Sequence, residues 1–271
     1  MKIGFIQSQP FLGNLKQTMR HLEPLLAATN EANLVVLPEL ANSGYNFKSK
    51  KMAWETSETI GDSQFIDFLK TIAKKNNQFI VSGFNERLEN QLFNTAILVG
   101  PDGYIGKYQK LHLYKNEKEY FQVGNTGLPI FDIGFCKIGL LICYDFWFPE
   151  VWRILSLKGT DIICHPSNLV MQGFGQRVAN LHARLNKVFV MTTNRIGSEG
   201  KLTFTGLSSI SSPKGRVLIQ APQNETHTAV IDIDIQQAKN KMVSPKNHLF
   251  EDRRIDVYGE LLDDFSPVNV F

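Results

Sequence analysis

The chain has 271 residues, of which 43% are hydrophobic and 20% are charged, and its formal net charge is +3. This composition is typical of a globular protein and excludes a largely disordered chain. The small charge indicates no nucleic-acid partner, and no segment approaches the ~18 consecutive apolar residues that a membrane-spanning helix needs.

Short apolar, β-branched segments alternate with amphipathic segments along most of the chain. We predict strands over residues 3–7, 34–37, 79–81, 138–143, 161–165 and 188–192, and helices beginning near residues 15, 65, 149 and 177. Pro24 predicts a kink or an early end of the first helix. This alternation favours an α/β fold in which helices cover the sheets.

The pattern changes after residue 206, where three further strands are expected over residues 207–212, 216–220 and 228–234. Turn residues such as Pro213-Lys214-Gly215 separate them. No linker, repeat or low-complexity segment interrupts the chain, so a single domain over residues 1–271 is expected.

The cysteine content and the N-terminal segment bear on the compartment. Cys136, Cys143 and Cys164 form no CxxC pair, and an odd number of cysteines suits no disulfide framework. The opening MKIGFIQSQP lacks the basic and then long apolar segments of a signal peptide. We therefore expect a reducing compartment, the cytoplasm.

Three chemically capable side chains follow apolar strands. Glu39 comes after LVVLP, Lys110 lies in KYQKLHLY, and Cys143 closes IGLLIC. Strand ends border the crevice in which α/β folds place ligands. A cysteine nucleophile needs a base and an oxyanion donor, which a carboxylate and an ammonium can supply. Taken singly, each is more often a packed thiol or a solvated, paired charge.

The sequences around these three residues resemble a known family. LVVLPELANSGY, KYQKLHLY and GLLICYDFWFPEVWR resemble the three signature blocks of the nitrilase superfamily, also called the carbon-nitrogen hydrolase family. KIGFIQSQP, KGTDIICHPSN, GLSSISSPKG and FEDRRIDVYGEL extend the resemblance over almost the whole chain. The resemblance implies a four-layer αββα sandwich, a back-to-back homodimer or higher homo-oligomer, and a C-terminal tail, from about residue 235 to 271, that extends to the partner.

The resemblance also assigns catalytic roles. It makes Glu39 the general base, Cys143 the nucleophile and Lys110 a transition-state donor, assisted by the backbone N–H of Tyr144. A second family glutamate falls on Glu117 when NEKEYFQVGN is aligned to the pattern E-K-x-x-F-x-x-G, although Glu119 lies only two positions away. No metal or organic cofactor is implied, and the histidines show no HxxxH-type ligand spacing.

Substrate-binding side chains are expected at Tyr45, Tyr144 and Asn168, within or beside the loops 42–51 and 168–176 that should set specificity. Several other conspicuous residues have less specific interpretations. His112 and His165 are expected to form structural hydrogen bonds, and Cys136 and Cys164 to be packing thiols. Asp145 and Arg153 would support the site or pair at the surface, and residues 146–148 would form a pocket wall or core.

The function predicted from these features is hydrolysis of a small linear amide or nitrile through a thioester, which releases ammonia and a carboxylic acid. Hydrolysis of an N-carbamoyl-amine uses the same residues and remains open. A hypothesis of another class is a catalytically silent protein that uses the fold to bind a partner. Such a protein should have lost a catalytic residue, yet Glu39, Lys110 and Cys143 are all present. A metal-dependent hydrolase lacks candidate ligands.

Overall fold

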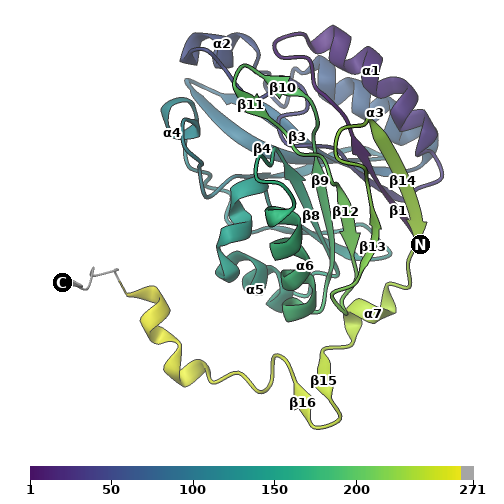
Figure 1. Cartoon of the computed structure of the whole chain (residues 1–271), viewed down its shortest axis with the longest axis vertical. Coiled ribbons are helices and arrows are strands. Elements are labelled where there is room, and N and C mark those ends of the chain that lie inside the picture. Colours follow the sequence, from purple (N-terminus) through teal and green to yellow (C-terminus); the bar gives the residue numbers. More distant parts are fainter. Residues whose placement is uncertain (264–271) are drawn as a thin grey trace.

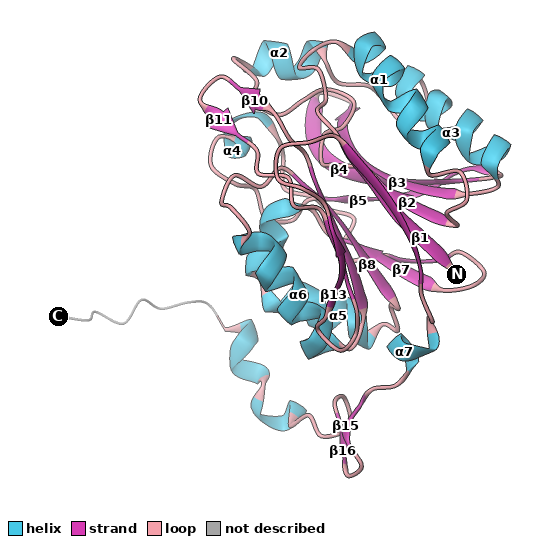
Figure 2. Cartoon of the chain, turned by 45° about the vertical axis from the view of Figure 1, so that its right-hand side comes forward, coloured by secondary structure: helices cyan, strands magenta, loops and turns pink. Residues whose placement is uncertain are grey.

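The computed structural model describes residues 1–263, and the last part of the expected tail, residues 264–271, lies outside that range. Two six-stranded sheets pack face to face, and helices cover the outer face of each (Figures 1 and 2). The predicted α/β class and the four-layer αββα arrangement are confirmed. No helix among residues 1–263 is long and apolar enough to cross a bilayer.

The first sheet has the strand order β14-β1-β2-β3-β4-β5. Its central strands β1, β2 and β3 run parallel, and β14, β4 and β5 each pair antiparallel with the strand that they join: β1, β3 and β4, respectively. Its elements, with the two helices on its outer face, are β1 (Lys2–Gln7), α1 (Leu15–Ala28), β2 (Leu34–Val36), α3 (Gln64–Asn76), β3 (Phe79–Leu88), β4 (Gln91–Gly100), β5 (Gly103–Gln109) and β14 (His227–Asp232).

The second sheet has the order β13-β12-β9-β8-β7-β6, with β7, β8 and β9 parallel. Its elements, with the helices on its outer face, are β6 (Ile130–Asp132), β7 (Lys137–Leu140), α5 (Pro149–Leu157), β8 (Ile162–Ser167), α6 (Phe174–Asn186), β9 (Phe189–Asn194), β12 (Ser209–Ser211) and β13 (Val217–Gln220).

Shorter elements border these layers or follow them. Near the strand ends lie α2 (Lys50–Glu55), α4 (Glu117–Tyr120), a 3₁₀ helix (Cys143–Trp147), β10 (Ser198–Glu199) and β11 (Leu202–Thr203). The chain then continues through α7 (Gln236–Lys239), β15 (Met242–Ser244), β16 (Asn247–His248) and two 3₁₀ helices (Ile255–Val257 and Gly259–Leu262). Of this last part, α7 packs against the sandwich with Ala238 buried in its core, whereas β15, β16 and the two 3₁₀ helices stand away from it (Figure 1).

The alternation of side chains along β2 shows how the layers are held together. Leu34 and Val36 point into the core between the two sheets, which they share with Ile138 and Leu140 of β7. Val35 points the other way, into the core beneath α1 and α3. Because a strand alternates its side chains, three consecutive apolar residues bury both faces of the sheet.

Of the kink or early end predicted at Pro24, the early end does not occur, because α1 continues through Pro24 to Ala28. Pro24 lies on the exposed side of the helix, where the carbonyl group that loses its N–H partner can be hydrated. On the opposite side, Leu22 and Leu26 are buried in the core and anchor the helix on both sides of the proline.

The strand predicted over residues 138–143 also ends earlier. β7 stops at Leu140, and Cys143 begins a 3₁₀ helix with a φ of 41°. The antiparallel strands β4 and β5 are not among the predicted strands. The remaining predicted strands and helices are present, with ends that differ by a few residues.

Candidate active site

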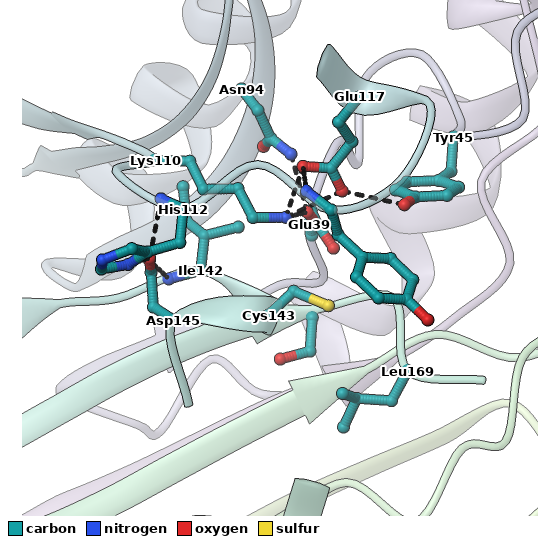
Figure 3. Close-up of polar contacts among 12 residues, drawn as sticks. Glu39, Tyr45, Asn94, Lys110, His112, Glu117, Ile142, Cys143, Asp145 and Leu169 are labelled. Atoms are coloured by element: carbon teal, nitrogen blue, oxygen red, sulfur yellow. Dashed lines mark hydrogen bonds and ion pairs between the residues drawn. The ribbon is translucent and has the colours of Figure 1, made fainter. Parts of the chain in front are cut away.

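Four polar side chains meet in the space between the strand ends (Figure 3). Glu39 follows β2, Lys110 follows β5, Glu117 opens α4, and Cys143 follows β7. Each is 6% exposed or less. The structure thus brings together the catalytic set that the sequence predicted, from segments spread over more than 100 residues.

Lys110 is the centre of this cluster. Its Nζ donates to Oε1 of Glu39 at 2.7 Å and to Oε1 of Glu117 at 2.8 Å. Burial alone would lower the pKa of Lys110, but the two carboxylates outweigh it and raise the pKa above its usual value. Lys110 is therefore an ammonium ion at neutral pH and can hold a developing negative charge.

The two oxygens of the Glu39 carboxylate differ in their surroundings. Oε1 accepts hydrogen bonds from Nζ of Lys110 and, also at 2.7 Å, from Nδ2 of Asn94. Oε2 is buried and has no partner among the described residues. One oxygen is therefore fixed by two donors, and the other is free to accept a proton.

Glu117 lies against Lys110, whereas Glu119 is exposed. The Glu117 carboxylate also accepts the hydroxyl hydrogen of Tyr45 at 2.8 Å and the backbone N–H of Tyr114 at 3.2 Å. Burial raises the pKa of Glu117 against the opposing attraction of Lys110. Burial likewise raises the pKa of Tyr45, so its phenol stays protonated and donates.

The Cys143 thiol shares this buried environment. Burial and the adjacent Glu39 raise its pKa well above the usual value, with Lys110 acting in the opposite direction. The backbone of Asn168 lies near the thiol and, like Lys110, lowers its pKa. At neutral pH Cys143 is therefore a protonated thiol, and a base must remove its proton as it attacks.

The backbone at Cys143 is strained, because a φ of 41° is unfavourable for a residue with a Cβ atom. The imidazole of His165 supports this conformation with its Nε2 atom 2.9 Å from the carbonyl oxygen of Cys143. Burial lowers the pKa of His165 to about 4, so the ring is neutral and Nε2 carries the donated hydrogen. His165 forms the structural hydrogen bond expected of it. The conformation also places the Tyr144 amide in the first turn of the 3₁₀ helix, where an N–H group has no acceptor within the helix.

Asp145 joins the cysteine segment to the lysine segment. Its Oδ2 accepts from the backbone N–H of Ile142 and from the hydroxyl of Tyr108, both at 2.8 Å, while Oδ1 lies 2.7 Å from Nδ1 of His112. Asp145 and His112 therefore hold the cysteine and lysine segments together through hydrogen bonds. Arg153 does not, because its guanidinium donates to the carbonyl of Leu185 and packs over Phe250.

A cavity of about 350 Å³ opens onto Cys143. Tyr45, Tyr144 and Asn168, the three expected substrate-binding residues, line it, as do parts of the two predicted specificity loops. Further lining residues were not predicted; they come from the segment around α4 and from the turn between β10 and β11, and are Tyr114, Lys115, Asn116, Tyr120, Phe121, Lys201 and Leu202. No group of His, Cys, Asp and Glu side chains within residues 1–263 is arranged to hold a metal ion.

The aromatic residues 146–148 serve as both pocket wall and packing. Phe146 is buried and lines the cavity, and Trp147 lines it with 48% of its surface exposed. Phe148 instead stacks on His112, with 3.6 Å between the ring centroids.

Two polar features of the site were missed from the sequence. One is Asn94, which orients Glu39 from the antiparallel strand β4. The other is the buried pair of Arg195 and Glu199, in which the Glu199 carboxylate accepts the backbone N–H groups of Tyr45 and Asn46 at 3.0 and 2.7 Å. In both cases the available signal was a polar residue inside or directly after an apolar strand segment, LFNTAILVG and FVMTTNR.

The family model described as carbon-nitrogen hydrolase matches residues 2–241. The chain belongs to the carbon-nitrogen hydrolase family. This membership, together with nitrilase- and amidase-named relatives, confirms the nitrilase-superfamily resemblance and shows that the protein is a carbon–nitrogen hydrolase.

Similar proteins within this family carry several names. A nitrilase of Pyrococcus abyssi is 40% identical over 95% of this chain and 99% of its own length. An N-carbamoylputrescine amidase of Solanum lycopersicum is 30% identical over 91% of this chain and 90% of its own. The crystal structure of a carbon-nitrogen hydrolase from Helicobacter pylori superposes with a TM-score of 0.87 at 27% identity, and covers 98% of this chain and 99% of its own.

Proposed function

We propose that this carbon-nitrogen hydrolase cleaves a small linear amide or nitrile through a thioester on Cys143. The observation that carries the proposal is the free oxygen of Glu39: Oε2 is buried and unpartnered among the described residues, in the same cluster as Lys110 and a protonated Cys143. A base, a nucleophile and a cationic donor therefore share one buried site at the base of a cavity.

In the first step Oε2 of Glu39 takes the proton from the Cys143 thiol as Sγ attacks the carbonyl carbon of an amide. The C–S bond forms, and the carbonyl π electrons move to oxygen. A thiol with a raised pKa gains little from ionising in advance, so removal of the proton during attack suits this environment.

The resulting oxyanion is held by the Lys110 ammonium and by the backbone N–H of Tyr144. Glu117 keeps the ammonium in place without touching the substrate, because its own oxygens are occupied by Lys110, Tyr45 and the Tyr114 amide. Donors fixed in advance in a buried site stabilise developing charge without having to reorganise.

The intermediate collapses when the C–N bond breaks and Glu39 returns its proton to the leaving nitrogen, which releases ammonia. Water then attacks the thioester while Glu39 accepts its proton, and the C–S bond breaks to give the carboxylic acid and the Cys143 thiol. With a nitrile the first adduct is a thioimidate, and one additional water yields the same products.

Substrate binding is assigned to the cavity wall. Tyr144 and Asn168 flank Cys143, and Tyr45 presents its ring, since its hydroxyl group is taken by Glu117. A cavity of about 350 Å³ suits a small molecule.

An ammonia-release screen over short amides, nitriles and carbamoyl-amines tests the function. We expect turnover of an amide or nitrile by the wild type, and none by Cys143→Ala, whose fold should remain intact by circular dichroism. Cys136→Ala and Cys164→Ala serve as controls that keep activity. Full activity of Cys143→Ala would refute the mechanism. If only carbamoyl-amines are turned over, the substrate is a carbamoyl-amine and not a small amide or nitrile.

The same assay tests the alternative hypothesis that the chain is a catalytically silent binding protein. In that case a thiol reagent would modify Cys143, yet no substrate in the screen would be hydrolysed. Loss of hydrolysis in step with modification of Cys143 supports the enzyme instead.

We also propose a homodimer, supported by apolar surface on two neighbouring helices and on the tail. Ile154 and Leu157 of α5 and Leu181 and Leu185 of α6 are exposed, and so are four apolar residues of the tail, Ile255, Val257, Leu261 and Leu262. A two-fold pair would cover these surfaces. Light scattering should report a particle near twice 30.7 kDa, and a monomer at micromolar concentration would contradict this.

The cytoplasm is proposed as the location, supported by three buried cysteines that are all free thiols. Fractionation of the producing cell would test it, and recovery of the protein outside the cytoplasm would refute it.

A further inference from the structure

The cavity of this enzyme has an uneven distribution of charge. Three of its lining residues carry charged side chains: Glu117, Lys115 and Lys201. Glu117 is buried and its oxygens are occupied by Lys110, Tyr45 and the Tyr114 amide, so it offers no free carboxylate to a ligand. The charge available to a bound molecule is therefore positive.

The two lysines approach the cavity from different segments. Lys115 lies in the loop that precedes α4, and Lys201 in the turn between β10 and β11. Both are exposed, which places them at the mouth, and neither forms an ion pair with any residue in the range 1–263. Lys115 has a φ of 47°, an uncommon conformation for a residue with a side chain, and its Nζ lies over the ring of Tyr114.

The walls of the cavity are largely apolar. Phe47, Trp147, Leu169 and Leu202 are among the side chains that line it. Such walls would accommodate the short methylene chain of a substrate. A charged group of the substrate would be unfavourable against them, because it would lose its water, and would be stable only at the solvent-exposed mouth.

At the inner end, Asn168 offers unused hydrogen-bonding capacity. Its side chain lines the cavity and is 4% exposed, and neither Oδ1 nor Nδ2 has a partner among the described residues. Asn168 and Cys143 both line this cavity, and the Asn168 backbone lies near the Cys143 thiol. An unsatisfied buried amide is unfavourable in the free enzyme, and a ligand with a donor and an acceptor would relieve it.

We propose, on the basis of the function proposed above, that the preferred substrate is the monoamide or mononitrile of a short linear dicarboxylic acid. Its reacting amide or nitrile lies at Cys143 beside Asn168, its methylene chain lies against the apolar walls, and its far carboxylate is held by Lys115 and Lys201. A substrate with a cationic far end, such as a carbamoylated diamine, meets two like charges and no free carboxylate, and is disfavoured.

Three primary amides of similar length test the charge preference: succinamate with an anionic end, butyramide with a neutral end and β-alaninamide with a cationic end. We expect kcat/KM to fall in that order. Each contact between a lysine and the far end of the substrate should change kcat/KM by roughly fivefold, which corresponds to the free energy of an exposed ion pair. The preference should shrink as salt is added, because exposed charges are screened.

Charge reversal at the mouth gives the decisive comparison. In the double variant Lys115→Glu/Lys201→Glu, the ratio of kcat/KM for succinamate over β-alaninamide should invert. The matched control Lys16→Glu/Lys214→Glu makes the same change in net charge at exposed positions away from the cavity, and should keep the wild-type ratio. An unchanged ratio in the first variant, or an equal shift in the control, would overturn the proposal.

A second readout does not depend on turnover. Methanethiosulfonate reagents with anionic, neutral and cationic tails label Cys143 at measurable rates, and the anionic-to-cationic rate ratio should fall at least fivefold in Lys115→Glu/Lys201→Glu. If that ratio shifts while no amide is hydrolysed, the positive mouth stands and the hydrolytic function fails. If butyramide is hydrolysed while neither ratio responds to the lysines, the function stands and the carboxylate preference fails.

Discussion

The Nζ atom of Lys110 lies 2.8 Å from the carboxylate of Glu117, and both side chains are almost completely buried. An ammonium group on a flexible side chain is a poor oxyanion donor unless its position is fixed. Glu117 supplies that restraint from one side and Glu39 from the other. This geometry supports the proposal that the second glutamate positions Lys110 and takes no part in proton transfer.

This arrangement predicts different outcomes for two neighbouring glutamates. Glu117→Gln should reduce kcat roughly a hundredfold, because a preorganised donor contributes on the order of 3 kcal/mol to transition-state stabilisation. Cys143 should remain reactive towards a thiol reagent. Glu119→Gln is the matched control, since Glu119 is exposed, and its rate should stay near wild type. If Glu119→Gln instead loses most of its kcat while Glu117→Gln stays active, Glu119 is the residue that positions Lys110.

Replacing Glu39 by Gln tests the free oxygen of the carboxylate. The amide can still accept from Lys110 or Asn94 through its oxygen, but its nitrogen cannot accept the thiol proton. Turnover should fall at least ~10²-fold. Steady-state rates across the pH range give the measurement, and a change smaller than tenfold with an unaltered pH profile would reassign the general base.

Much of the site could be predicted because of where strands end. Glu39, Lys110 and Cys143 each follow a strand, and such ends meet at one edge of the layers. The αββα class was likewise accessible, since strand and helix periodicities alternate and the family blocks fall in order. These properties are local, so they can be seen in one sequence without knowing what packs against it.

The missed features depend on long-range register. Asn94 reaches Glu39 because β4 pairs antiparallel with β5, and this pairing brings the backbone N–H of Lys110 2.8 Å from the carbonyl oxygen of Asn94. The bend at Cys143 was missed for a related reason. Leu141 and Ile142 have strand composition, but the hydrogen bonds from Ile142 to Asp145 and from His165 to Cys143 turn the chain out of the sheet.

The buried imidazole of His165 predicts how stability depends on pH. Its pKa in the folded protein is about 4, below the ordinary value of 6.5, so the unfolded chain binds more protons between these values. The stability that this neutral imidazole contributes to the folded state is fully present above about pH 6.5. It is lost as the pH falls towards 4, which lowers the free energy of unfolding by on the order of 3 kcal/mol. His182, with a similar pKa of about 4, adds to the same loss.

Urea unfolding between pH 4 and 7 measures this dependence. His165→Gln keeps a donor that can reach the Cys143 carbonyl but removes the titrating group, so its free energy of unfolding should fall less steeply on acidification. His248→Gln, in the tail hairpin, is the control and should follow the wild type. Identical slopes for wild type and His165→Gln would contradict the assignment.

Arg195 and Glu199 form a buried pair that supports the cavity wall at Tyr45. The Glu199 carboxylate is paired with the buried Arg195 and accepts the backbone N–H of Tyr45 at 3.0 Å, and the Tyr45 hydroxyl donates to Glu117. We expect Glu199 to act on catalysis through Tyr45. Glu199→Gln should lower kcat roughly tenfold and also destabilise the fold, because Arg195 loses its buried partner.

A double-mutant cycle separates positioning from general destabilisation. Tyr45→Phe removes only the hydroxyl group and should lower kcat roughly tenfold with little loss of stability, since the ring stays in place. If Glu199 acts through Tyr45, the variant carrying both changes should lose little more kcat than either alone, because neighbouring residues in one hydrogen-bond network are not additive. The kcat values of the wild type, the two single variants and the double variant are measured at a temperature where all four proteins are folded. If the two losses in kcat multiply to about a hundredfold in the double variant, Glu199 acts independently of Tyr45.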